Sequence, residues 1–312
     1  MLPLDRPRAP AAPLGAALYE SHYLTAASPD GGRAIWVRHT ALKRPGQPAH
    51  PTAWLTLFDG SAPAPRALRV TAAEPVADPG ESWWRCSLGD IGPGRAHGEI
   101  GEPGGSWDLA WQPRAGALPY LPAPWLYDRP FPRSGGAALM PAGTTDGRVV
   151  LDGEEVIIAG WEAMVGHNWG SDHAHRWCWL HAGGLGDDGL GWLDLVLVRI
   201  RLGPAVTPWI ASGALALAGR RWAPAPMRRV TCARSEERTS VAVSLSPRAA
   251  LDLSIVAPRH ATQTWDYAAP RGPGRLVDNC CVADLRLRLT SRGFTADLSA
   301  TGVAAVEHGG PA

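Results

Sequence analysis

The sequence predicts an all-β protein built from antiparallel sheets. Along its 312 residues, apolar patterns with the 3.6-residue period of a helix are scarce. The 36 glycines and 30 prolines separate short runs that are rich in Val, Ile, Leu and Trp. Several runs alternate between apolar and polar residues, as a strand with one buried face does. Short strands with turn residues between them are typical of an antiparallel sandwich or barrel.

The predicted strands follow one another closely along the chain. The first half holds runs at 34–39, 53–58, 66–72, 82–88, 106–112, 148–151 and 155–160. The second half holds runs at 176–182, 191–202, 227–233, 239–245, 250–257, 281–289 and 294–300. Within 281–289, DLRLRL places Asp284, Arg286 and Arg288 on one face and three leucines on the other. This alternation indicates a strand with one face in the core.

Two segments interrupt the series of strands. The first, around ALPYLPAPWLYDRPFP, combines many prolines with aromatic residues and has no strand pattern. A long segment of this kind inside a domain is usually functional or a linker, so we expect residues 113–133 to cover the mouth of a cavity. The second, LGPAVTPWIASG at 202–213, indicates a domain boundary. The predicted domains are therefore residues 15–203 and 204–309.

Composition excludes several classes of function. With a net charge of +1, the chain has no basic surface that would predict nucleic-acid binding. Its 5 cysteines form no CxxC pair, which favours a reducing compartment over a disulfide framework. No stretch reaches the roughly 18 apolar residues of a membrane span. We therefore expect a cytoplasmic protein with at most transient membrane contact; the sequence does not predict its oligomeric state.

Tryptophan is unusually frequent, with 15 residues against 3 Phe and 5 Tyr. Most of these are expected to fill the core, although such a bias also fits the lining of a large cavity. The densest window is WEAMVGHNWGSDHAHRWCWLH, residues 161–181. It could form a metal site, an acid–base site or a well-filled core.

The histidines of this window do not match a complete set of metal ligands. His173-x-His175 could place two rings on one face of a strand, as in cupin barrels. The Glu that the cupin pattern requires is absent, because Trp179 and Leu180 occupy its positions. The HxxxH spacing of a helical zinc site is absent too. The sequence predicts no bound metal and no cofactor.

Acid–base chemistry and structural packing both remain open for the window. In a strand, Trp177, Trp179 and His181 share one face and form an aromatic wall with a titratable group at its end. Glu162 and His167 lie before the expected Asn168–Trp169–Gly170 turn, and a carboxyl group buried beside Trp can act as a general acid near neutral pH. The alternative is that the turn is structural and the tryptophans fill a barrel.

Other catalytic motifs are missing from the sequence. It contains no GxSxG, and Cys280–Cys281 has no glycine-rich oxyanion turn beside it. The glycine-rich segment 89–105 lacks a GK[ST] and a following helix, so it is interpreted as hairpin turns and not as a phosphate loop.

The sequence GHNWG, followed by RWxWxH, resembles the superfamily of hydroxyneurosporene synthase, also called carotenoid 1,2-hydratase. Tocopherol cyclases share a similar NWG turn and a WxW strand. WDYAAP (265–270) with NCCVADLRL (279–287) resembles the second domain of that superfamily. The resemblance is sharp over about 30 residues and diffuse elsewhere. This chain has Gly166–His167 where the hydratases often have Asp-His.

The resemblance implies two lipocalin-like β-barrels packed together, with apolar ligand space in or between them. Enzymes of the superfamily hydrate, cyclise or join isoprenoid or polyene substrates without a cofactor. A cationic reaction would need a proton donor and indole faces, whose cation–π attraction can be worth around 2 kcal/mol when desolvated. A cycloaddition would need orientation alone.

The leading hypothesis is therefore a cofactor-independent enzyme that hydrates or cyclises a lipophilic isoprenoid or polyene. The alternatives are a non-catalytic carrier or sensor of an apolar ligand, a cycloaddition catalyst and a metal-dependent β-barrel enzyme. The candidate catalytic residues are His167, Asp172, Glu162 and His181. The candidate substrate-binding residues are Trp161, Asn168, Trp177, Trp179, Trp192, Trp265 and Tyr267.

Overall fold

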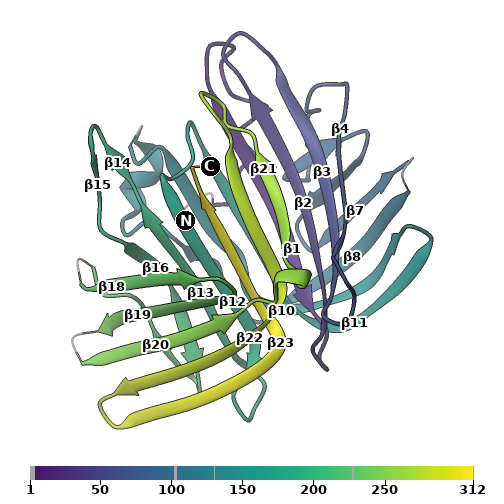
Figure 1. Cartoon of the computed structure of the whole chain (residues 1–312). Coiled ribbons are helices and arrows are strands. Elements are labelled where there is room, and N and C mark those ends of the chain that lie inside the picture. The colour runs from purple at the N-terminus through teal and green to yellow at the C-terminus, as the bar shows by residue number, and fades with distance from the viewer. Residues whose placement is uncertain (1–3, 102–103, 130, 227, 247, 312) are drawn as a thin grey trace.

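The computed structural model describes residues 4–101, 104–129, 131–226, 228–246 and 248–311. It confirms the all-β prediction: two large, curled antiparallel sheets hold nearly all of the regular secondary structure of the described residues (Figure 1). The described helices are two short 3₁₀ turns, η1 (Pro124–Asp128) and η2 (Arg259–Ala261). None of the described helices is long and apolar enough to cross a membrane.

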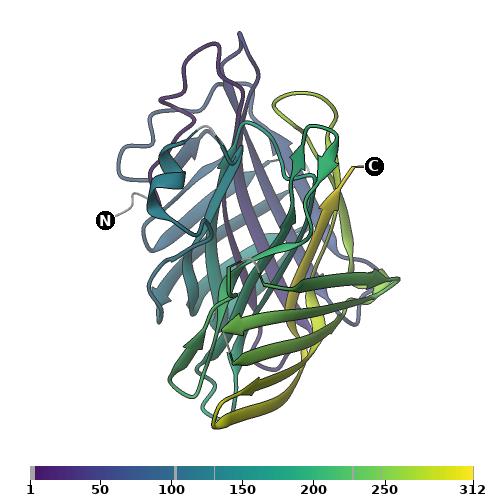
Figure 2. The same cartoon turned by 90° about the vertical axis from the view of Figure 1, so that its left-hand side faces the viewer.

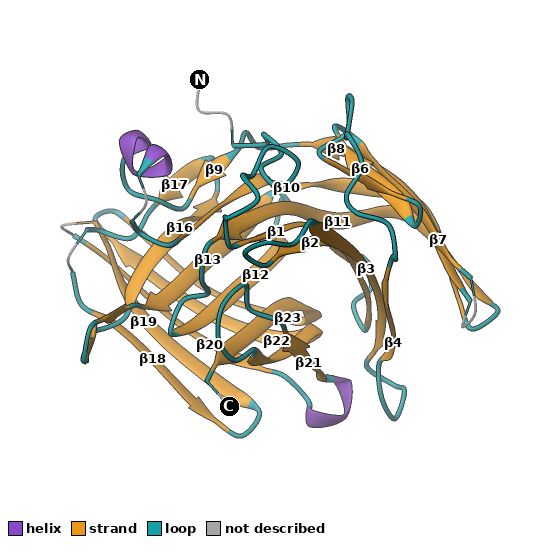
Figure 3. Cartoon of the chain, turned by 90° about the horizontal axis from the view of Figure 1, so that it is seen from above, coloured by secondary structure: helices purple, strands orange, loops and turns teal. Residues whose placement is uncertain are grey.

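The first sheet is formed by the N-terminal part of the chain and has 11 strands in the order β4-β3-β2-β1-β11-β10-β8-β7-β6-β5, with β9 pairing β10. Seen from above, it curls into an open arc (Figure 3). Its strands are β1 (Leu18–Ala27), β2 (Arg33–Lys43), β3 (Ala49–Asp59), β4 (Arg66–Thr71), β5 (Trp84–Cys86), β6 (Gly89–Gly92), β7 (Arg95–Ile100), β8 (Gly105–Pro113), β9 (Leu118–Pro119), β10 (Ser134–Leu151) and β11 (Glu154–Gly170).

The second sheet has 10 strands in the order β17-β16-β13-β12-β23-β22-β20-β19-β18, with β21 pairing β22. A small hairpin, β14 (Arg201–Leu202) and β15 (Ala205–Val206), stands beside it. The strands of the sheet are β12 (Arg176–Leu185), β13 (Gly191–Arg199), β16 (Ile210–Leu217), β17 (Arg220–Trp222), β18 (Val230–Ser235), β19 (Arg238–Ser246), β20 (Ala249–Val256), β21 (Gln263–Tyr267), β22 (Arg275–Ser291) and β23 (Phe294–Gly310). Met227, predicted to begin a strand, lies outside the described residues.

The division between the sheets differs from the predicted domain boundary. The chain leaves the first sheet after Gly170 and enters the second at Arg176. The predicted boundary at 203/204 instead falls in the turn of the β14–β15 hairpin. Its proline and glycine residues mark a local turn, whereas the step between the sheets takes only residues 171–175. The RWCWLH strand therefore belongs to the second sheet.

The segment GHNWG forms the end of β11 and is not a turn, which corrects the sequence prediction. Its glycines allow close packing. A Cβ on Gly166 would lie 2.3 Å from the Tyr23 ring, and one on Gly170 would lie 2.3 Å from the Arg133 carbonyl oxygen. Glycine is thus required here because neighbouring atoms approach closely.

The first sheet packs its convex face against the second sheet, where β22 and β23 contact β1 and β2 (Figure 2). Strands β1 and β2 are therefore covered on both faces. Side chains alternate along each strand. On β2, Ile35 and Val37 point into the core inside the first sheet, whereas Trp36 joins the core shared by both sheets. On β1, Leu24 and Tyr23 divide in the same way.

Candidate functional site

A cavity of about 350 Å³ lies between the two sheets. Tyr23 (β1), Trp36 (β2) and Asn168 (β11) line it from the first sheet, and residues of β12, β13 and β23 line it from the second. The remaining wall comes from the proline- and aromatic-rich segment that was expected to cover a cavity. Residue 130 of that segment is outside the described residues. The lining residues of the segment are Tyr120, Leu121, Pro122, Leu126, Phe131 and Pro132.

Asp194 on β13 is a buried carboxylate behind one wall of this cavity. Its Oδ1 accepts a hydrogen bond from the Tyr120 hydroxyl at 2.7 Å, and its Oδ2 accepts one from Trp179 Nε1 at 3.4 Å. His181 Nδ1 lies 3.4 Å from the same Oδ2. Burial raises the pKa of Tyr120 well above its ordinary value, with Asp194 adding to the effect. Tyr120 therefore stays protonated and serves as a donor.

Glu307 on β23 is a second carboxylate, and it lines the cavity directly. It accepts hydrogen bonds from Trp177 Nε1 at 2.8 Å, from the Tyr267 hydroxyl at 2.9 Å and from Asn279 Nδ2 at 3.4 Å. The three donors come from β12, β21 and β22 and fix the position of the carboxyl group. Like Asp194, Glu307 is thus an acceptor in a hydrogen-bond network whose outer surface is aromatic.

Tyr23 places a hydroxyl group at the cavity. Burial raises the pKa of this hydroxyl, and the nearby Asp194 raises it further. A hydrogen bond from Asn168 acts in the opposite direction. The ring of Tyr23 meets that of Trp179 edge to face at 5.9 Å between centroids. Gly136 makes room for the amide, since a Cβ there would lie 2.4 Å from Asn168 Oδ1. The Tyr23 O–H has no carboxylate hydrogen-bonded to it among the described residues, so it can donate to a ligand.

Four of the proposed substrate-binding residues line the cavity: Asn168, Trp177, Trp179 and Tyr267. The other three lie elsewhere. Trp161 packs in the core inside the first sheet, whereas Trp192 and Trp265 are buried in the core shared by the sheets. His173, which the sequence analysis considered only as a possible metal ligand, also lines the cavity. Burial lowers the pKa of His173 to about 4, so it is neutral near pH 7.

The four proposed catalytic residues are not among those that line the cavity. Glu162 pairs with Arg114. Asp172, in the segment between the sheets, lies 3.8 Å from Arg133 and 3.9 Å from Arg275. His181 stacks behind Trp179 at 6.0 Å, on the face that the strand period predicted. His167 points into the first sheet.

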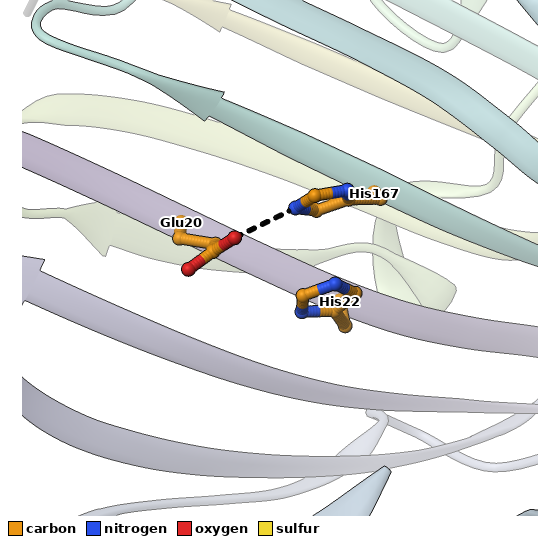
Figure 4. A group of neighbouring side chains, drawn as sticks. All are labelled: Glu20, His22 and His167. Carbon is orange, nitrogen blue, oxygen red and sulfur yellow. Dashed lines mark hydrogen bonds and ion pairs between the residues drawn. The ribbon is translucent and has the colours of Figure 1, made fainter. Parts of the chain in front are cut away.

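His167 belongs to a buried group with Glu20 and His22 (Figure 4). His167 Nδ1 donates to the Leu4 carbonyl at 2.6 Å, and Nε2 donates to Glu20 Oε1 at 2.9 Å. Both ring nitrogens thus face oxygen atoms, and His167 and Glu20 form a buried pair. The backbone N–H groups of Arg8 and Ala9 also donate to Glu20. The pair thereby fixes residues 4–9 against the sheet.

The ligand atoms of Glu20, His22 and His167 lie within 4.8 Å of one another, the one such group found among the described residues. Two imidazoles and a carboxylate are a donor set that zinc or iron accepts. However, the two rings are stacked at 3.9 Å between centroids and 12° from parallel, so their nitrogens lie in nearly parallel planes and are not directed at one shared point. A shared ion would require the His22 ring to rotate. The present geometry fits a buried ion pair better than a metal centre.

The sequence analysis missed Tyr23, Tyr120, Asp194 and Glu307. A signal for the two carboxylates is present in the sequence, because each is a single acidic residue inside an apolar strand, in GWLDLVLV and GVAAVEH. Such a residue is buried on folding and needs hydrogen-bond partners. The two tyrosines carry no comparable signal.

Comparison with known proteins supports the fold. No protein-family model matches the chain. The uncharacterized protein Rv0493c of Mycobacterium tuberculosis is 24% identical over 307 residues, covering 94% of this chain and 90% of that protein.

Two solved structures show the same architecture. The crystal structure of CghA with Sch210972 is similar with a TM-score of 0.65 and 12% identity, over 95% of this chain and 89% of CghA. A Nitrosomonas europaea protein named as an AttH is similar with a TM-score of 0.58 and 16% identity, over 100% of this chain and 97% of that one. At these identities the likeness shows a shared two-sheet, lipocalin-like fold, as the resemblance had implied.

Proposed function

We propose that this chain is an enzyme that binds a lipophilic polyene or isoprenoid substrate in the cavity between the sheets and promotes its cyclisation, by cycloaddition or a related ring closure. The observation that carries this proposal is the cavity itself, which has aromatic walls and a protonated tyrosine hydroxyl, that of Tyr23, as a free donor. CghA, which has the same fold, was crystallised with the small molecule Sch210972, and this agrees with ligand binding by the fold.

The cavity supports catalysis through orientation. Its volume of about 350 Å³ falls within the usual range of small-molecule sites. Packed indole and phenol faces restrict a flexible chain to a few folded conformations. Holding reacting atoms in the correct geometry can supply about 7–11 kcal/mol of a barrier. An intramolecular ring closure draws on the part of this contribution that comes from fixing bond rotations, because that entropy loss has already occurred on binding.

Tyr23 is suited to polarising a substrate carbonyl by hydrogen bonding, and not to transferring its proton completely. Its raised pKa keeps the hydroxyl protonated and makes it a weak acid. A hydrogen bond from such a donor to a substrate carbonyl withdraws electrons from a conjugated double bond and stabilises negative charge that develops on oxygen. The networks around Asp194 and Glu307 hold the surrounding wall in place, because each carboxylate fixes two aromatic residues.

Acid-assisted hydration is the second candidate. It would need a strong proton donor against the substrate, and Glu162, His167, Asp172 and His181 are all absent from the cavity lining. Glu307 does line the cavity, but three donors of the chain already hydrogen-bond to it. This arrangement favours ring closure over alkene protonation.

The test is turnover of a panel of linear polyenes, analysed by chromatography and mass spectrometry. Ring closure changes retention but not mass, whereas hydration adds the mass of one water. The Tyr23→Phe variant is expected to retain binding and to lose about 10²–10³-fold in turnover. Tyr127→Phe is the matched control, because its hydroxyl bonds to the Gly136 carbonyl and does not line the cavity. Equal turnover by the two variants would contradict the role of Tyr23.

A non-catalytic carrier remains the alternative, and the same cavity motivates it. Binding is measured by quenching of tryptophan fluorescence with retinol, with Val196→Phe as the cavity-filling variant and the exposed Ile157→Phe as its control. Loss of binding in Val196→Phe alone places the ligand in the cavity. Binding by the wild-type chain, combined with no product from any polyene, would favour the carrier.

A further inference from the structure

Arg38 on β2 is a buried cation without a counter-ion. Only 7% of the residue is exposed. Its Nε donates to Ser21 Oγ at 2.7 Å, and its two terminal nitrogens have no hydrogen-bond or ion-pair partner among the described residues. Arginine is rarely buried unless it is paired with an anion. The two terminal nitrogens therefore have donors left over for a group that is not part of the chain.

Aromatic rings surround Arg38 but do not use those donors. The Cζ atom of its guanidinium lies 4.0 Å from the centroid of the Tyr267 ring. The centroids of the Trp54 and Trp36 rings are farther away, at 5.4 and 5.5 Å. Cation–π attraction to these rings stabilises the charge. The terminal N–H groups make no hydrogen bond to the described residues. Cation–π contacts thus keep the group in place and leave its edge free.

That edge lies where two cavities meet. Beside the apolar cavity is a second one of about 390 Å³, lined largely by polar residues. Arg38, Tyr19, His173 and Tyr267 line both. A ligand in the apolar cavity can therefore reach Arg38 on the wall that the two cavities share.

Positive charge predominates in the polar cavity. Arg38, Arg44 and Arg69 line it, together with the carboxylates of Glu20 and Asp266. Glu20 is already held by His167 and by two backbone N–H groups. His173 on the shared wall is neutral near pH 7, since burial lowers its pKa to about 4. The free edge of Arg38 is thus the strongest attraction for an anion at the junction.

We propose that the substrate is amphiphilic, with an apolar chain in the cavity between the sheets and a terminal carboxylate bound by Arg38 at the junction with the polar cavity. This deepens the proposed function and rests on it. The planar fork of a guanidinium matches two carboxylate oxygens, which a neutral head group cannot replace. Arg38 also fixes the position of the chain along the cavity, and so selects which double bonds lie beside Tyr23.

The experiment compares all-trans-retinoic acid with its methyl ester, which share the polyene and differ in charge. Binding of each is followed by quenching of tryptophan fluorescence. The wild-type chain is expected to bind the acid about 10- to 100-fold more tightly than the ester, as a charged hydrogen-bonded pair permits. Arg38→Met is expected to lose this preference and to bind the ester within about 3-fold of wild type. Arg38→Lys, which keeps the charge without the fork, is expected to fall between them.

Arg33→Met is the matched control, because Arg33 is on the same strand, pairs with Asp59 and lines neither cavity. It should leave the preference for the acid unchanged. Equal affinity of the wild-type chain for acid and ester would overturn the Arg38 site and leave the proposed function standing. Binding of neither retinoid would overturn both. Should Arg38→Met fail to fold, the wild-type comparison and Arg38→Lys still decide the outcome.

Discussion

The inside of the first sheet and the cavity between the sheets hold the same kinds of side chain. They differ in whether the hydrogen-bonding groups of those side chains are already paired within the chain. Inside the first sheet, Glu20 and His167 satisfy each other and pin the N-terminal segment. At the cavity, Tyr23 and Arg38 keep donors that face open space. A dense group of histidines, carboxylates and tryptophans is therefore a weaker sign of function than one donor beside a void.

The strand period separates the two regions. On β11, His167 and Asn168 are neighbours in sequence and point to opposite faces of the sheet. One lies in the buried ion pair and the other lines the cavity. The same step separates Glu20 from Ser21 on β1, where Ser21 holds Arg38. Adjacent residues thus serve stability and ligand binding in turn.

The largest effect is expected for Glu20→Ala. It leaves His167 buried without its partner, and breaking a buried ion pair in this way lowers the free energy of unfolding by about 3–5 kcal/mol. Urea denaturation followed by circular dichroism measures the change. Affinity of the folded fraction for the uncharged retinoid ester should stay unchanged, because Glu20 lines the polar cavity and not the apolar one. A stable variant with weakened binding would reverse the roles assigned to the two regions.

Tyr120→Phe should have the next largest effect. Asp194 is fully buried and loses its 2.7 Å hydrogen bond, and a hydrogen bond to a charged group contributes about 1.5–3 kcal/mol. Because Tyr120 also forms the cavity wall, stability and retinoid affinity should fall together. Denaturant unfolding and fluorescence titration of the same preparation test this. If stability falls and retinoid affinity does not, Tyr120 stabilises the fold and takes no part in ligand binding.

The pH dependence of stability should reflect His39, which lies inside the first sheet. Burial lowers its pKa to about 3, whereas the unfolded chain takes up the proton near 6.5. Between these values the unfolded state binds more protons, so stability is complete above about pH 6.5 and falls as the pH drops, by up to about 1.4 kcal/mol per pH unit. His39→Phe should flatten this part of the profile. His173→Phe, at the cavity, should flatten a narrower part of the profile, because burial lowers the pKa of His173 only to about 4.

The smallest expected effect is that of a chelator. If Glu20, His22 and His167 form an ion pair, EDTA should leave the melting temperature unchanged, and elemental analysis of untagged protein should find no stoichiometric transition metal. A fall in melting temperature that added zinc restores would show that His22 rotates and that the group is a metal centre.

The sequence predicts the fold class well because strand alternation is local. The Arg286–Arg288 pattern does put alternate residues of β22 in the core. In contrast, β1 was not recognised, although it is the strand beside β11 and supplies Glu20, His22 and Tyr23. Its polar residues are buried on both faces, so burial does not follow polarity there and the usual pattern is lost.

The candidate site was predicted only in part, because sheet pairing joins residues that are distant in sequence. Trp177 and Trp179 were predicted to share a face, and both line the cavity. Glu307 reaches Trp177 through the pairing of β12 with β23, which no local pattern specifies. Arg38 stands out only once the folded structure shows that no described carboxylate pairs with its buried guanidinium.

The segment of residues 171–175 joins the sheets and also borders the cavity through His173 and Ala174. In its middle, Asp172 lies between Arg133, which precedes β10, and Arg275, which begins β22. These contacts are long and partly open to water, so added salt weakens them. Ion pairs of this kind contribute about 0–1 kcal/mol each, so added salt is expected to loosen this local link at the edge of the cavity while the shared apolar core keeps the sheets together.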